Sequence, residues 1–307
     1  MKKTTYILIA LVIAGALAII GNTIFFTSGG TPMKSVTISQ DMTTKPLATF
    51  SAIRIKVSPE YAHRHIISLD SNLTCNITGS RSATAPSVTM SPDWEKYLTL
   101  TLDNDTLTIN FDFHGAERYD VTDENENDKT TYYTDFYPQA INLTLPSGML
   151  RSLRLNRIVD TSISGIDSKS LEFDIYPVTF TNCDIDSMKV IPSSVTTRTT
   201  RSDDYDDSVY VETCYEPEYK YNSSAITLDN CRIKTFDIAL LPQAIDIYGS
   251  NGSAIDLVRW TDPATDTEKK KTAWLDNHSV EIGKIEWISP LGNRFKFESE
   301  GSMTITF

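Results

Sequence analysis

Short runs in which apolar and polar residues alternate occur throughout this chain, and one such unit recurs along its second half. The unit places a charged residue between two apolar ones, at Leu153-Arg154-Leu155, Leu171-Glu172-Phe173, Met188-Lys189-Val190, Phe236-Asp237-Ile238, Ile255-Asp256-Leu257 and Ile285-Glu286-Trp287. Alternation with a period of two predicts a β-strand with one buried face. The first three units follow one another at spacings of 18 and 17 residues, which indicates a repeat architecture.

A longer segment also repeats. Residues 182–190 (NCDIDSMKV) are matched by residues 230–238 (NCRIKTFDI). In both segments one step between apolar residues lengthens from two to three, which indicates a corner between strands. Short strands joined by corners predict an all-β fold with a parallel β-solenoid over residues 151–307, in which each coil buries its apolar face against its neighbours.

Two coils of this predicted solenoid are too long. The first excess lies near residues 193–223, which are rich in Asp and Tyr, and the second lies near residues 261–275. Insertions into solenoids emerge as loops, often on the binding face. Both segments are therefore expected to leave the core.

Residues 47–150 predict an N-terminal β region with antiparallel strands. Residues 98–102 and 107–113 alternate on either side of Asp103-Asn104-Asp105, which predicts a hairpin. Residues 114–138 are acidic, contain several tyrosines and have no period. We expect them to form a long surface loop.

The N-terminal segment predicts a membrane anchor over residues 1–26. Residues 6–26 carry no charge and can cross a bilayer as a single helix, and Lys2 and Lys3 precede them. The positive-inside rule then places the N-terminus in the cytoplasm and exports the bulk of the chain to the periplasm or cell surface, after a polar spacer over residues 27–46. A cleaved signal peptide, with a small-residue site near Ala16, is the alternative.

Charge and motifs argue against several kinds of site. A net charge of −12 leaves no basic face for nucleic acid. His63 and His65 have no third metal ligand, residues 123–134 lack the central Gly and final Glu of a calcium loop, and Cys75, Cys183, Cys214 and Cys231 lack the CxxC spacing of a zinc site. We therefore expect no metal, no cofactor and no catalytic residue.

Several strand patterns resemble the autotransporter-adhesin head family of bacterial envelope proteins, also called the GIN domain. The residues that carry the resemblance are the opening strand at 50–57, the hairpin arm at 105–109, the segment at 141–146 and the short repeats that follow. The resemblance covers roughly residues 47–260 and implies a stacked β-solenoid in a bacterial envelope. The family supplies no catalytic residues to carry over.

The function expected from these features is a non-enzymatic, membrane-tethered binding, adhesion or scaffold module whose ligand is an envelope protein or a glycan. Tyrosine gives contact area at low entropy cost, and the candidate contact surface is Tyr119, Tyr132, Tyr133, Tyr137, Tyr205, Tyr210, Tyr215 and Tyr219. A carbohydrate-active enzyme acting through surface carboxylates such as Asp184, Asp186 and Asp229 is the alternative.

The charged residues between the apolar pairs point outward in this arrangement, and stacking brings them into one column. Its predicted members are Arg154, Glu172, Lys189 and Asp237, followed by Asp256 and Glu286. The first four alternate in sign, so each faces an opposite charge. Such a column sets register and solubility more than stability.

Overall fold

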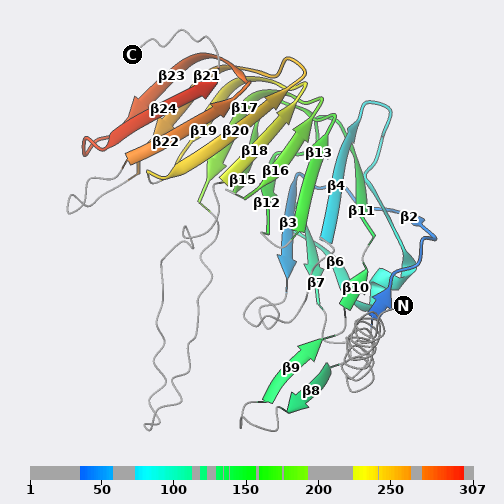
Figure 1. Cartoon of the computed structure of the whole chain (residues 1–307). Helices are drawn as coiled ribbons and strands as arrows, with labels where there is room; N and C mark the ends of the chain where they lie inside the picture. Colours follow the sequence, from blue (N-terminus) through cyan, green and yellow to red (C-terminus); the bar gives the residue numbers. More distant parts are fainter. Residues whose placement is uncertain are drawn as a thin grey trace, which may run out of the picture.

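The computed structural model describes residues 35–57, 73–112, 118–122, 129–133, 135–137, 139–156, 159–174, 176–192, 224–240, 242–263 and 272–300. Their fold is all-β and is dominated by two large mixed sheets, with strands that succeed one another along the molecule from the blue to the red end of the chain (Figure 1). Thr, Val, Ile and aromatic residues are frequent in these strands, as β-propensity favours.

Sheet 1 contains, in spatial order, β2 (Thr43–Pro46), β5 (Ser87–Met90), β11 (Ile141–Pro146), β4 (Leu73–Ser80), β13 (Val159–Ser164), β16 (Val178–Thr181), β18 (Ser224–Asp229), β20 (Ala244–Ser250), β22 (Thr272–His278) and β24 (Arg294–Glu300). Sheet 2 contains β23 (Glu281–Ile288), β21 (Ala254–Thr261), β19 (Arg232–Ile238), β17 (Asp184–Ile191), β15 (Leu171–Asp174), β12 (Ser152–Arg154), β3 (Ala52–Val57), β7 (Thr106–Phe111) and β6 (Leu98–Asp103), with β14 (Asp167–Ser168) beside β17.

From β11 onward the chain crosses from one large sheet to the other and back, strand by strand. β12 and β13 pair in parallel with β3 and β4, and from β15 onward each strand pairs in parallel with a strand of the previous crossing, as β17 does with β15 and β19 with β17. The antiparallel pairs lie at the other end, where β2 and β5 extend sheet 1 and β6 closes sheet 2. Strands from residues 47–150 and from residues 151–307 therefore share both sheets.

The register of the repeats follows the predicted pattern over its central part. Leu171 lies opposite Met188, and Met188 lies opposite Phe236, so the spacing of 17 residues and the match between residues 182–190 and 230–238 are confirmed. At β12 the register differs, because Leu153 lies opposite Phe173 and not Leu171. The short strand β14 precedes β15 in the same sheet and pairs with β17 at the same offset of 17 residues.

Asparagine and glycine form the corners between the sheets. Asn182 and Asn230 have φ of 52° and 50°, and Gly165 has φ of 64°, a left-handed conformation that these residue types tolerate best. The amide of Asn230 donates to the Asn182 side-chain oxygen at 2.6 Å, so successive corners are bonded to each other. At Gly79 the next corner approaches so closely that a Cβ atom would lie 2.4 Å from the Gly165 carbonyl oxygen.

The apolar core lies between the two sheets. Phe173 of sheet 2 meets Phe180 of sheet 1 edge to face at 5.5 Å, and both rings are fully buried. Ile163, Ile166 and Cys183 are buried as well. Because inward residues alternate with outward ones on every strand, each sheet also presents one outer face.

The hairpin predicted around residues 103–105 is confirmed. β6 and β7 pair antiparallel, and the two-residue turn Asn104-Asp105 has positive φ at both positions, as a type I′ turn requires. A short 3₁₀ helix, η1 (Pro92–Lys96), precedes it and buries Trp94 against Phe111.

Two stretches predicted to lack regular structure contain strands. Within residues 114–138, β8 (Arg118–Thr122) and β9 (Lys129–Tyr133) form an antiparallel pair, and β10 (Asp135–Tyr137) pairs with β1 (Ser35–Thr37). Within the expected spacer, β1 and β2 are strands and Ile38 is buried. The predictions of a loop and a spacer are wrong there: β8, β9 and β10 contain β-branched and aromatic residues beside the acidic ones, and β1 and β2 contain Val and Thr.

Three predicted features lie outside the described residues: the membrane span at residues 6–26, the segment 193–223 and most of the second insertion. Over the described ranges, no helix has the length and apolar character needed to cross a bilayer. The strands around the first insertion remain in register, since Val178 of β16 lies opposite Ile226 of β18.

Candidate functional site

The outer face of sheet 2 carries paired charges, which we call the charge ladder. It consists of Arg154, Glu172, Lys189, Asp237, Arg259, Glu286 and Lys284. A guanidinium Nη2 of Arg154 lies 2.6 Å from Glu172 Oε1, and Lys189 Nζ lies 3.7 Å from Glu172 Oε2. Lys189 is the register partner of Asp237.

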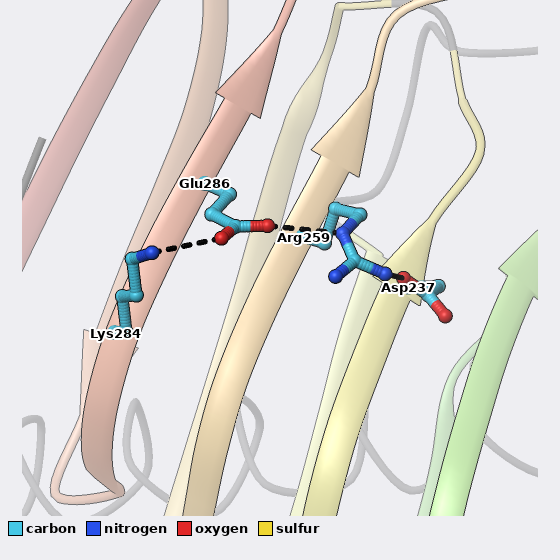
Figure 2. Close-up of polar contacts among 4 residues, drawn as sticks. All are labelled: Asp237, Arg259, Lys284 and Glu286. Carbon is cyan, nitrogen blue, oxygen red and sulfur yellow. Dashed lines mark hydrogen bonds and ion pairs between the residues drawn. The ribbon is translucent and has the colours of Figure 1, made fainter.

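Arg259 joins the far end of the ladder (Figure 2). Its Nη1 lies 3.2 Å from Asp237 Oδ1, and its Nε lies 3.0 Å from Glu286 Oε2. Lys284 Nζ reaches the other oxygen of Glu286 at 2.8 Å. Hydrogen bonds from Lys284 and Arg259 lower the pKa of Glu286, so this carboxylate stays ionised. The acidic groups of the ladder are thus already engaged by cations of the same face.

The outer face of sheet 1 has a different chemistry. Opposite positions on seven consecutive strands hold Thr44, Thr89, Asn142, Asn76, Ser162, Thr179 and Thr227, which we call the polar row. None of these side chains is charged. The first five form two hydrogen-bonded groups: Thr44 with Thr89 at 2.8 Å, and Asn76 with both Asn142 at 2.9 Å and Ser162 at 2.6 Å. Within the described residues, the hydroxyls of Thr179 and Thr227 make no hydrogen bond.

Two aromatic rings continue the polar row. Tyr248 lies opposite Thr227, and His278 lies opposite Tyr248. Their rings stack with centroids 4.4 Å apart and planes 7° from parallel, and the Tyr248 side chain is 41% exposed. On the same face Trp274 is 38% exposed, but the ammonium of Lys296 covers its ring at 4.0 Å from the centroid.

One carboxyl group is buried at the end of β15. Asp174 is 1% exposed, and its Oδ1 accepts a hydrogen bond from the backbone N–H of Leu155 at 2.5 Å. Burial raises the pKa of Asp174 to about 6, and the charge of Arg154 opposes that rise only weakly. This group has the pKa of a general acid but no access to a substrate.

Comparisons with known proteins give distant likenesses. The sequence matches no family model and no curated protein. A solved "putative adhesin" from Bacteroides fragilis is similar at 8% identity and a TM-score of 0.39, with 87% of this chain and 100% of that chain covered. A "putative lipid binding protein" from Parabacteroides distasonis is similar at 13% identity and a TM-score of 0.34, with 89% and 100% covered.

A "putative cell adhesion protein" from Clostridium sporogenes is a third similar structure, at 10% identity and a TM-score of 0.21 over 85% of this chain and 99% of that one. At TM-scores this low, the likeness assigns neither a ligand nor an activity to this chain.

The structure places the predicted charge column in sheet 2 and changes one member. Arg259, not Asp256, lies opposite Asp237, so the assignment of Asp256 to the column is wrong. The inward pair that matches Phe236 and Ile238 is Val258 and Trp260, and Arg259 stands between them. Asp256 lies earlier in β21. The pKa of Lys234 is raised mainly by Asp186, and the charge of Asp256 contributes less to the same effect.

The carboxylates nominated for catalysis do not converge. Asp184 lies opposite Arg232 on sheet 2, and Asp186 is paired with Lys234 at 2.5 Å on the same face. Asp229 lies on sheet 1, where hydrogen bonds from Ser250 and Asn251 lower its pKa. A glycosidase needs two carboxyl groups on either side of one bond. Asp184 and Asp186 share one face of β17, but each lies beside a basic residue of β19, and Asp229 is on the other sheet.

The predicted tyrosine surface is only partly within the described chain. Tyr119 lies in β8, Tyr132 and Tyr133 in β9, and Tyr137 in β10. Tyr205, Tyr210, Tyr215 and Tyr219 lie outside the described residues, as do His63, His65 and residues 123–128. Among the residues that are described, no group of three metal-ligating side chains comes together.

The described cysteines, Cys75, Cys183 and Cys231, are free and buried. Burial raises the pKa of the Cys75 thiol to about 12, so it stays protonated. The polar row was missed from the sequence. The sequence feature that could have revealed it is the alternation of Thr, Ser and Asn with apolar residues, as in Thr179-Phe180-Thr181. This alternation predicts a strand with an uncharged polar outer face, and such strands form a polar row when they pair in register.

Proposed function

We propose that this chain is a non-enzymatic, membrane-tethered envelope protein whose exported part binds a partner, as an adhesion or scaffold module. The observation that carries the proposal is the polar row, which aligns uncharged hydrogen-bonding groups over seven strands of one outer face. On the charge ladder of the other face, by contrast, the ionic groups already satisfy one another. Binding therefore belongs to sheet 1.

The proposed architecture is a β-solenoid with two broad sides. Its support is the alternation of the chain between the two sheets and, from β15 onward, the parallel pairing of each crossing with the last. Coils that stack in this way present the same outward positions at intervals of about 4.8 Å. That regularity suits an extended partner, and it agrees with the resemblance to the autotransporter-adhesin head family.

Absence of catalysis is supported by the placement of the carboxyl groups. Asp184 and Asp186 are matched by basic partners on sheet 2, Asp229 is on sheet 1, and Asp174 is buried. The two that share a face, Asp184 and Asp186, each have a basic neighbour on β19. Incubation of the full chain with plant and bacterial polysaccharides should release no reducing ends, and their appearance would favour the polysaccharide-active alternative.

Tethering and export rest on the apolar residues 6–26 and the lysines before them. Protease added to intact spheroplasts should digest the part of the chain after residue 34. Complete protection would place that part in the cytoplasm and would contradict the proposal.

Binding through sheet 1 is tested with cells that display the full chain, by measuring their adherence to surfaces coated with mucin or with purified bacterial cell walls. Thr227→Lys places a long cation in the polar row and should reduce adherence. Thr235→Lys is the matched control, since Thr235 is a half-buried threonine on sheet 2. Equal adherence of all three proteins would exclude the sheet 1 face, and adherence no higher than that of cells lacking the chain would contradict a binding role.

A further inference from the structure

One face of the Tyr248 ring is directed toward the polar row. Tyr248 and His278 are opposite one another on neighbouring strands, which lie about 4.8 Å apart. Their rings stack face to face at nearly that distance, 4.4 Å. Both rings therefore stand upright on the sheet, with His278 covering one face of Tyr248. The other face is directed across β18, where its register partner is the much shorter Thr227.

Short polar residues form a floor in front of this ring. Thr179 and Thr227 lie opposite one another, and so do Thr181 and Asp229, so these four side chains occupy adjacent outward positions on β16 and β18. Within the described residues, none of the three threonine hydroxyls makes a hydrogen bond. We call these four residues and Tyr248 the shelf.

Asp229 supplies the shelf with a fixed acceptor. Its Oδ1 accepts hydrogen bonds from Ser250 Oγ at 2.6 Å and from the amide of Asn251, which hold the carboxylate in place. Its Oδ2 has no partner among the described residues. Asp246 lies on β20 two residues before Tyr248, opposite Ala225, and places a second carboxylate on the same outer face. Asp229 lies opposite Ser250, two residues after Tyr248. The aromatic ring thus stands between two groups that accept hydrogen bonds.

A sugar ring has the complementary chemistry. Its C–H face is apolar and packs on an aromatic ring, while its hydroxyls donate to carboxylates and exchange hydrogen bonds with threonine. We propose that the shelf binds one sugar residue of an uncharged glycan, with Tyr248 stacked on the sugar and the rest of the glycan following the polar row. This inference rests on the proposed binding function and names the class of its ligand.

The charges of this face argue against other ligands. Asp229 and Asp246 disfavour an acidic polysaccharide or a nucleic acid, because no cation of the shelf offsets them. An amine would be attracted by both carboxylates, but the seven uncharged side chains of the polar row would add nothing to the binding of a cation. An extended neutral polyol uses both parts of the face.

The test is binding of the full chain, purified in a detergent without a sugar headgroup, to immobilised oligosaccharides. The probes are cellohexaose, mannohexaose and chitohexaose as neutral glycans, fully deacetylated chitohexaose as the cationic counterpart, and hexagalacturonate as the acidic one. We expect at least one neutral probe to bind and neither charged probe to bind more tightly. Exclusive binding of the deacetylated probe, or of the acidic one, would overturn the ligand class.

Variants then locate the site. Tyr248→Ala should weaken binding roughly two- to tenfold, the range for loss of one aromatic contact, and Tyr248→Phe should retain it. Trp274→Ala is the matched control, because Trp274 is an equally exposed aromatic on the same sheet whose ring is covered by Lys296. The proposed site would be overturned if Tyr248→Ala left the binding of the neutral glycan unchanged, or if Trp274→Ala reduced it as much as Tyr248→Ala does.

Failure of this inference is distinct from failure of the proposed function. If no neutral probe binds but Thr227→Lys still reduces the adherence of the cells, sheet 1 binds another kind of partner and only the glycan assignment is wrong. If the cells also adhere no better than cells lacking the chain, both proposals are wrong.

Discussion

Asp174 makes the stability of this protein depend on pH in a direction opposite to that of most carboxyl groups. Its side chain is buried, and burial raises the pKa of its carboxyl to about 6 from the ordinary value of 3.8. The folded protein thus holds the proton more tightly than the unfolded chain does. Asp174→Asn keeps an acceptor for the Leu155 N–H, at present 2.5 Å from Oδ1, and removes the titration.

The magnitude follows from the two pKa values. A shift from 3.8 to about 6 is about two pKa units, and each unit corresponds to about 1.4 kcal/mol. Because the folded-state pKa is the higher one, the stabilising contribution is complete below about pH 4 and is lost as the pH rises through 6. At pH 7 the wild type should therefore carry a cost of about 3 kcal/mol that Asp174→Asn does not carry.

Urea unfolding of the two proteins between pH 3.5 and 7.5 measures this difference. The free energy of unfolding of Asp174→Asn minus that of wild type should rise with pH, mostly between pH 4 and 6. Asp174→Ala serves as the control: it also lacks the titration, so its curve should run parallel to that of Asp174→Asn but lower, because the Leu155 N–H loses its acceptor. A difference independent of pH, or one that falls with pH, would refute the reasoning.

Two further predictions concern the charge ladder and the corners. Glu172→Lys places three cations in a row with Arg154 and Lys189 and should lower stability more than Glu172→Gln does, by about 0.2–1 kcal/mol per pair. In thermal melts, the difference in stability between the two variants should narrow at high salt. Equal melting of the two variants at low salt would contradict the ladder. Gly79→Ala should cost about 1–3 kcal/mol in urea unfolding, because the new Cβ would meet the Gly165 carbonyl at 2.4 Å, whereas Gly148→Ala, with its nearest atom at 3.3 Å, should cost less; equal costs would count against that close approach.

The strands of this fold were predictable where alternation alone decides burial. The buried residues Leu171, Phe173, Met188 and Val190 follow the period of two directly, and the repeated Asn-Cys segment identifies the partners of β17 and β19. Register was harder to predict in β21, where two consecutive triplets, Ile255-Asp256-Leu257 and Val258-Arg259-Trp260, both fit the pattern. Only the pairing with β19 distinguishes them, and pairing depends on the lengths of the corners before each strand.

The candidate site was less predictable than the fold for a related reason. Each residue of the polar row is an ordinary outward residue of its own strand, and no motif within one segment identifies it. Thr44 and Thr227 belong to one row only because seven strands are aligned at matching positions. Asp174 gives no local signal either, since its raised pKa results from burial at the end of β15. Sequence patterns report the inward face of such strands better than the chemistry shared by their outward faces.

The pairing of β16 with β18 has a consequence for how this molecule can change over generations. β17 ends at Ile191 and β18 begins at Ser224, yet Phe180 lies opposite Leu228 in the same register as the neighbouring pairs. The length of chain between two crossings is therefore independent of the alignment of the strands that it joins. Segments can be gained, lost or exchanged at this junction without disturbing the rest. Related chains could thus diverge in what they carry there while keeping the same two faces.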